Sequence, residues 1–265
     1  MGVISLSPYD LAVAASLLLA VAALSYLLRL GNSGQIVVAG VRMTSQLLLL
    51  GIVLKSLFAH TNFLWVTLMA LVMLAAAARE VTSRQKRRFK GVWGFGIGAV
   101  SMFISSFTVT LIALAVIIQN RPWYLPQYAI PLLGMLLGNT MNGIALGLER
   151  LTANAWQQKP VIEARLILGQ SWNQAIGDVR KECIRSGMIP IVNSMAAAGL
   201  VSLPGMMTGQ ILAGSPPFEA VKYQILIIFL IAAGTGFGTM SAVYSASRRL
   251  FDERQRLRLD RLKGQ

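Results

Sequence analysis

The sequence predicts an all-α polytopic membrane protein with about seven transmembrane helices. Its 265 residues have a mean hydropathy of +0.62, and only 13% of them are charged, about half the share found in soluble domains. The apolar runs are continuous and lack the alternation of apolar and polar residues that is typical of transmembrane β-strands. Because no long polar stretch could house a soluble domain, we expect one transmembrane domain over residues 1–265.

Seven runs have the length and apolar character that a helix needs to cross the hydrocarbon core. In order they are Pro8–Leu28, Ile36–Phe58, Thr61–Ala78, Val92–Ile118, Gln127–Leu148, Met188–Leu212 and Ala220–Ser247. The first run has no basic region before it and no small-residue cleavage pattern at its end, so we interpret it as a span and not as a signal peptide. The second contains Arg42 and Lys55, and the third is short.

Glycines recur in the later spans and predict close helix packing. They open the fourth span and follow helical spacing in the fifth, at Gly134, Gly138, Gly143 and Gly147. Small residues let helix backbones approach closely, within one bundle or across a homodimer. The glycines at 234, 236 and 238 resemble a nucleotide-binding loop only superficially, because they lie inside an apolar span with no preceding strand.

The basic residues predict the orientation of the chain. Of the 24 Lys and Arg residues, 20 lie at Arg29, in loop 79–90, in segment 149–187 and in the tail 248–265. By the positive-inside rule this side is cytoplasmic, which places the N-terminus outside and the C-terminus inside. Topology thus explains the net charge of +14, and no nucleic-acid partner is expected. The basic runs are predicted to contact anionic membrane lipids, with partner docking by the tail as the alternative. Arg42 is predicted to snorkel to the interface, with an ion pair to Glu149 or Glu80 as the alternative.

The acidic residues argue against ion-driven transport. None of the ten Asp and Glu residues lies deep within a predicted span, where ion-coupled carriers usually keep a carboxylate. A Walker sequence is also absent. We therefore expect a transporter subunit without enzymatic activity or a bound cofactor, whose ATP is used by a partner.

Segment 149–187 is the predicted docking site for such a partner. Pro160 can begin a helix, and apolar residues recur at helical spacing at Val161, Leu168, Trp172, Ile176, Val179 and Cys183. This pattern predicts an amphipathic helix over residues 160–185, which could lie on lipid or fit a partner's groove. The stretch Glu163-Ala164-Arg165, followed by Gly169, resembles the E-A-A-x-x-x-G signature of the loop that couples ABC-importer permeases to their ATPase, although Arg165 replaces the second alanine.

A longer resemblance covers essentially the whole chain and is strongest from about residue 139 onward. The run from Asn193 to Gly214, NSMAAAGLVSLPGMMTGQILAG, resembles the hallmark of the bacterial iron-export ABC permease family (FetB-like). Plant aluminium-sensitivity ABC permeases are more distantly similar. The resemblance implies a homodimeric permease in the bacterial inner membrane that pairs with two copies of a cytoplasmic ABC ATPase and exports iron. The residues expected to couple to the ATPase are Glu163, Ala164, Arg165, Gly169 and Trp172.

The sixth span carries the predicted substrate path. Proline removes a backbone hydrogen bond, so Pro204 and Gly205 predict a break, and broken helices in transporters often line the binding site. The candidate path residues are Asn193, Met195, Pro204, Gly205, Met206, Met207 and Gln210, with Asn139 of the fifth span as a further candidate that is predicted to be buried. Met206 and Met207 are candidate metal ligands, since thioethers bind softer metals. Core packing and interhelical hydrogen bonding are the alternative roles for these residues.

The sequence leaves four functions open. We expect an iron-exporting ABC permease. The alternatives are an ABC permease for another metal or small solute, with import possible, an ion-coupled carrier, and a membrane scaffold that does not transport.

Overall fold

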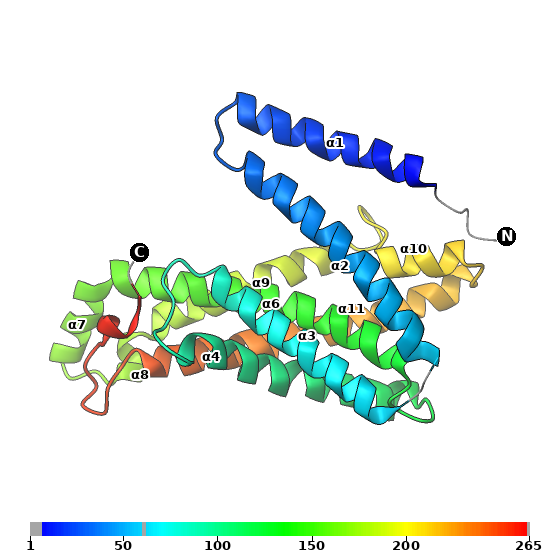
Figure 1. The fold of residues 1–265 in the computed structure, drawn as a ribbon. Helices are drawn as coiled ribbons and strands as arrows, with labels where there is room; N and C mark the ends of the chain where they lie inside the picture. The colour runs from blue at the N-terminus through cyan, green and yellow to red at the C-terminus, as the bar shows by residue number, and fades with distance from the viewer. Residues whose placement is uncertain (1–6, 60–61, 264–265) are drawn as a thin grey trace.

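The computed structural model describes residues 7–59 and 62–263 and forms an elongated helical bundle with a two-helix arm (Figure 1). The helices are α1 (Pro8–Leu27), α2 (Ser33–Ala59), α3 (Phe63–Ser83), α4 (Trp93–Met102), α5 (Thr108–Ile112), α6 (Pro126–Gln157), α7 (Lys159–Ile167), α8 (Trp172–Ala175), α9 (Gly177–Ala197), α10 (Gly205–Leu212) and α11 (Pro217–Arg249). Two π-helical turns, η1 (Phe103–Phe107) and η2 (Ala113–Ile118), extend α4 and α5, and a 3₁₀ turn, η3 (Leu259–Arg261), lies near the C-terminus.

Six helical segments in the described part of the chain are long and apolar enough to cross a membrane, which confirms the predicted class. They are Pro8–Leu27, Ser33–Ala59, Phe63–Ser83, Trp93–Ile118, Pro126–Gln157 and Pro217–Arg249. Thr61, where the third span was predicted to begin, lies outside the described residues. The predicted sixth span is not one helix: α9 and α10 lie in series beside α11, separated by residues 198–204 (Figure 1).

The core lies where α11 packs against α6 and α9, with α3 and α4 on the other side. The helix backbones of the core approach most closely at glycines, as predicted. A Cβ at Gly143 would stand 2.7 Å from Thr235 Cγ2, and one at Gly187 would stand 2.6 Å from the Gly143 carbonyl oxygen. The close approach is selective, however, because a Cβ at Gly138 would meet no atom within 4 Å.

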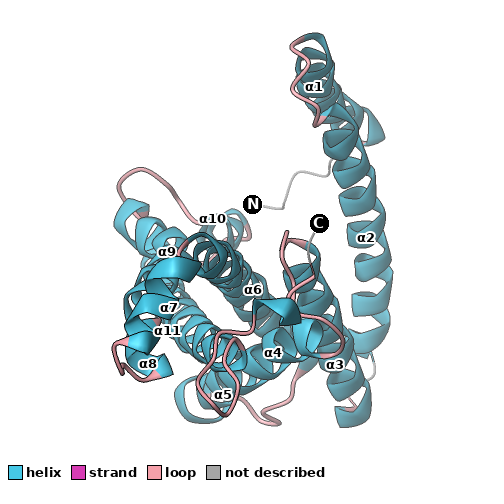
Figure 2. Cartoon of the chain, turned by 90° about the vertical axis from the view of Figure 1, so that its left-hand side faces the viewer, coloured by secondary structure: helices cyan, strands magenta, loops and turns pink. Residues whose placement is uncertain are grey.

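The arm formed by α1 and α2 stands apart from the bundle, as the end-on view shows (Figure 2). Helix α1 packs mainly against α2 and buries only Ala22 and Ser25. Its N-terminus is fixed by a capping box in which the Ser7 hydroxyl accepts from the Asp10 N–H and the Asp10 carboxylate accepts from the Ser7 N–H. Arg42 of α2 forms an ion pair with Glu80 of α3 at 3.2 Å. The ion pair to Glu80, the less favoured alternative, is therefore present, and snorkelling of Arg42 to the interface stays a prediction.

Candidate functional site

One end of the bundle gathers loop 84–92, helices α7 and α8 and the C-terminal segment 250–263, and we call it the basic end (Figures 1 and 2). Phe89 and Leu262 form an antiparallel bridge, and both side chains are buried. The Lys90 N–H donates to the Arg261 carbonyl oxygen at 2.9 Å, and the Lys263 N–H donates to the Arg88 carbonyl oxygen at 2.8 Å. The two predicted basic runs are therefore folded onto each other, and their lipid contact stays a prediction.

The C-terminal segment contains ion pairs between its own arginines and aspartates. Arg258 donates to both carboxylate oxygens of Asp260, at 2.8 and 2.9 Å, and these hydrogen bonds lower the pKa of Asp260 to about 2. The Arg256 N–H donates to Asp252 at 2.8 Å, which lowers the pKa of Asp252. A positive φ of 58° at Gln255 turns the chain between these pairs. The segment therefore keeps its paired carboxylates ionised at neutral pH.

The turn between α7 and α8 ends α7 in a Schellman motif. Gly169 has a φ of +85°, its N–H donates to the Leu166 carbonyl oxygen, and the Gln170 N–H donates to the Arg165 carbonyl oxygen. Ser171 and Gln174 then cap α8 reciprocally. The predicted single helix over residues 160–185 was therefore wrong, because the left-handed glycine and the new cap divide it into α7, α8 and the first part of α9.

The same turn exposes two large apolar side chains, and we call Ile167 and Leu168 the apolar tip. Their exposed fractions are 85% and 81%. Leu168 was predicted on the buried face of one long helix. It is exposed because α7 stops one residue before it, whereas Ile176, Val179 and Cys183 of the same predicted face are buried. An apolar pair this exposed is typical of a contact surface for another molecule.

The five predicted coupling residues surround this turn, but they face different ways. Arg165 pairs with Asp178 of α9 at 2.9 Å and Glu163 pairs with Lys159 at 3.8 Å, while Ala164 is exposed. Trp172 points inward and ties the turn to the bundle. Its ring meets Tyr244 and Phe251 edge-on or tilted, with centroids 6.0 Å apart in both cases.

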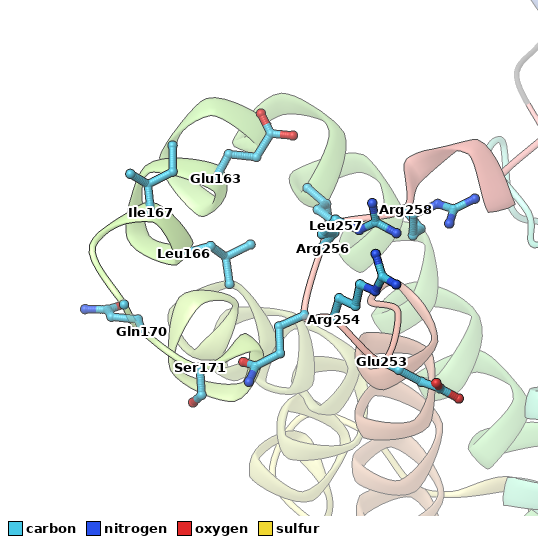
Figure 3. Close-up of a pocket in the computed structure, with 12 residues that line it drawn as sticks. Glu163, Leu166, Ile167, Gln170, Ser171, Glu253, Arg254, Arg256, Leu257 and Arg258 are labelled. Atoms are coloured by element: carbon cyan, nitrogen blue, oxygen red, sulfur yellow. The ribbon is translucent and has the colours of Figure 1, made fainter.

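A cleft of about 930 Å³ separates α7 and the α7–α8 turn from the C-terminal segment (Figure 3). Glu163, Leu166 and Ser171 line one side, and the opposite side is strongly basic. Its lining there includes Arg254, Arg256 and Arg258. The Trp172 N–H, which directly follows Ser171, donates to Gln255 Oε1 at 2.8 Å, so a hydrogen bond joins the two sides. The basic charge of the tail was predicted from the sequence, but the position of the tail beside α7 was not.

The predicted break in the sixth span is present, and it is longer than predicted. Helix α9 ends at Ala197, Gly199 has a φ of +83°, and Pro204 caps α10. The chain is extended at Pro204, with a ψ of 140°, so the helix restarts at Gly205 and is not merely kinked. Helix α9 begins at Gly177, eleven residues before the predicted span, and its polar first half packs against α6 and α11.

Among the described residues, the predicted path residues are spread over exposed and buried positions. Asn193 and Met195 are exposed on α9, and Met207 is buried. Asn139 was predicted to be buried, but it is exposed and donates to the carbonyl oxygen of Met135 at 2.8 Å. Its placement on the outside of the bundle reflects the helical spacing of α6, whose buried glycines occupy the other face. A metal-binding role for Met206 and Met207 stays a prediction.

Three glutamines have a buried side-chain oxygen with no partner among the described residues, and two of these glutamines lie on neighbouring helices. The oxygens of these two are Gln210 Oε1 on α10 and Gln224 Oε1 on α11, two helices that pack together. An unpaired buried amide oxygen costs free energy unless a ligand or water satisfies it. Gln210 is one of the predicted path residues, whereas Gln224 was not predicted. An amide in the first turns of an otherwise apolar span is the signal that could have identified it.

Comparison with known proteins gives one consistent family. The family described as "Uncharacterised protein family (UPF0014)" matches residues 8–251. A UPF0014 membrane protein of Synechocystis sp. is 43% identical over 86% of this chain and 87% of its own length. The "Probable iron export permease protein FetB" of Escherichia coli is 33% identical over 84% and 83%. The Arabidopsis thaliana "Protein ALUMINUM SENSITIVE 3" is 28% identical over 83% and 79%. No solved structure matches the chain.

Proposed function

The chain belongs to the UPF0014 family of membrane proteins, and on that premise we propose that it is the membrane-spanning permease subunit of an ABC transporter that exports iron from the cytoplasm. In this proposal it lies in a bacterial inner membrane with its basic end in the cytoplasm. Two copies form the transmembrane part. Two copies of a separate ATPase bind and hydrolyse the ATP.

The exposed apolar tip is the observation that supports binding of an ATPase partner. Ile167 and Leu168 are exposed apolar side chains at the basic end, which the proposed orientation places in the cytoplasm. Lipid contact is the competing use of an apolar pair. The tip is flanked by Glu163, Gln170 and the arginines of the cleft, a mixed polar rim of the kind that surrounds protein contacts. The iron cargo is supported by the name of the Escherichia coli relative, "Probable iron export permease protein FetB".

The contacts behind the tip supply a route for movement. The Trp172 ring makes an edge-on contact with Tyr244 of α11, and Arg165 pairs with Asp178 of α9. A displacement of the tip by the ATPase therefore reaches both α11 and α9, the helix that leads to the break at residues 198–204. In the proposed cycle, ATP closes the ATPase pair, the turn moves with it, and α9 and α10 change which side the path faces.

Iron movement in inside-out vesicles tests the proposal. Vesicles that contain this chain and its candidate ATPase are expected to accumulate ferrous iron when ATP is added, and omission of either subunit should abolish the accumulation. Transport without the ATPase would instead indicate an ion-coupled carrier. Stimulated ATP hydrolysis without iron uptake would keep the ABC assignment and point to another cargo or to import. Partner binding without any flux would indicate a scaffold.

Replacement of the apolar tip by serines is expected to weaken ATPase binding without unfolding the chain. Ile167→Ser and Leu168→Ser together remove two apolar side chains that make little contact within the protomer, and substitutions at such exposed sites usually change stability by about 0.5 kcal/mol or less. Co-purification of the ATPase measures the binding, and thermal unfolding in detergent measures the fold.

Val161→Ser is the matched control, because Val161 is a half-exposed apolar residue on the same helix but away from the turn. It should leave co-purification unchanged. Equal ATPase binding by the double variant and the wild type would show that the tip is not the docking site.

A further inference from the structure

Residues 198–204, which we call the break segment, present non-helical backbone at a depth where lipid cannot cover it. Arg185 is the last charged residue of α9, and Ala197 lies about 18 Å beyond it at 1.5 Å per residue. Helix α10 continues from Gly205 for another 12 Å or so. Together the two helices span about the 30 Å of a hydrocarbon core, so the segment between them lies inside it.

The break segment leaves polar backbone groups unsatisfied. The Gly199 N–H donates to the Ser202 carbonyl oxygen, and the Val201 and Ser202 N–H groups donate to the Ala197 carbonyl oxygen. The structure gives the Leu200 N–H no acceptor among the described residues. Helix α10 also begins without a side-chain cap, which leaves the N–H groups of its first turn free. Lipid-exposed irregular backbone of this kind does not occur in the hydrocarbon region.

The side chains of the break segment exclude water as the main covering. Leu200 is 91% exposed, Val201 is 87% exposed and Leu203 is 66% exposed, and the segment projects beyond the bundle (Figures 1 and 2). Lining of a water-filled cavity by three large apolar side chains would be unfavourable. Unsatisfied backbone combined with apolar side chains requires the surface of another protein.

The ATPase of the proposed function cannot be that protein, because it binds the basic end, and the break segment lies on the far side of α9. A second copy of this chain in the same membrane can reach it. Three alanines at 196–198 and Gly199 precede the exposed leucine, and small residues allow a neighbouring helix to approach closely. Asn193, exposed one turn before them, offers a polar side chain for hydrogen bonding across such a contact.

We propose that the break segment and the end of α9 form the contact between two copies of the chain, so that the two broken helices meet at the centre of the dimer. The inference rests on the proposed function for its dimeric permease, and it adds which surface the two copies share. The opposite side of the bundle, formed by α4 and the π-helical turns, faces lipid.

Disulfide cross-linking in membranes tests this surface. The only cysteine in the sequence is Cys183, which is buried, so a Cys183→Ala background allows one cysteine to be placed at a time. Leu200→Cys in intact membranes should give, on oxidation, a product at twice the 28.7 kDa mass of the chain. Ile104→Cys is the matched control, since Ile104 is an exposed apolar residue of η1 in the middle of the fourth span. The helix α4 that leads into η1 lies across the bundle from α9 and α10 (Figure 2). The control variant should remain a monomer.

Val201→Cys serves if the first variant does not accumulate in the membrane. A dimer band at residue 200 or 201 and none at 104 supports the assignment. Absence of the band, together with labelling of residue 200 by a membrane-impermeant maleimide, would overturn it in favour of a water-lined surface. Absence of both would overturn it in favour of lipid. Cross-linking does not depend on iron, so failure of this inference is distinguished from failure of transport.

Discussion

Gly169→Pro is expected to abolish ATP-dependent transport and the stimulation of the partner's ATP hydrolysis, while the chain still inserts into the membrane. Gly169 has a φ of +85°, whereas proline is fixed near −65°. Proline would also remove the N–H that donates to the Leu166 carbonyl oxygen. The Schellman turn could then not form, and Ile167 and Leu168 would leave the position from which they contact the ATPase.

Gly177→Ala is the matched control for this substitution. Gly177 opens α9 at the same end of the bundle, its φ is not positive, and a Cβ there would meet no atom within 4 Å. It should support normal transport and normal ATP hydrolysis, measured in the same vesicles. Membrane insertion is checked by the amount of each variant in the membrane fraction. Wild-type transport by Gly169→Pro would show that this turn does not couple the chain to an ATPase.

The sequence was sufficient for the helices that face lipid, because there hydropathy and environment agree. Hydropathy failed at α9, where Asp178, Arg180, Lys181 and Arg185 lie along the first turns of a helix that packs against α6 and α11. Asp178, Lys181 and Arg185 are exposed on these turns, so the apolar signal begins only at Met188. The error at Asn139 has a different cause, since periodicity alone does not say which face of α6 the other helices cover.

The candidate docking site was predicted in part. The sequence predicted Gly169 as a coupling residue in an E-A-A-x-x-x-G-like stretch, and in the structure Gly169 has the left-handed conformation that favours glycine. Contacts between distant segments were harder to predict. The Arg42–Glu80 pair was the less favoured of two alternatives, and nothing in the sequence pairs Trp172 with Gln255, which lies 83 residues away.

Gly143→Ala is expected to destabilise the bundle, whereas Gly138→Ala on the same helix is not. A Cβ at residue 143 would lie 2.7 Å from both Thr235 Cγ2 and Thr239 Oγ1, and 3.0 Å from the carbonyl oxygen of Gly187. These atoms cannot move away easily. Thr235 and Thr239 are buried on α11, and the Gly187 carbonyl oxygen belongs to the backbone of α9. Overpacking of this kind typically costs about 1–3 kcal/mol.

The two glycines separate the two uses of small residues that the sequence left open. At residue 138 a Cβ meets no atom within 4 Å, so alanine should leave the free energy of unfolding of the protomer unchanged or raise it slightly. Unfolding of both variants in detergent, followed by circular dichroism, measures the difference. Equal stability of the two variants would contradict the close approach of α6, α9 and α11. If Gly138→Ala instead reduced the amount of dimer with the protomer intact, Gly138 would belong to the contact between copies, and α6 would lie beside the break segment at the centre of the dimer.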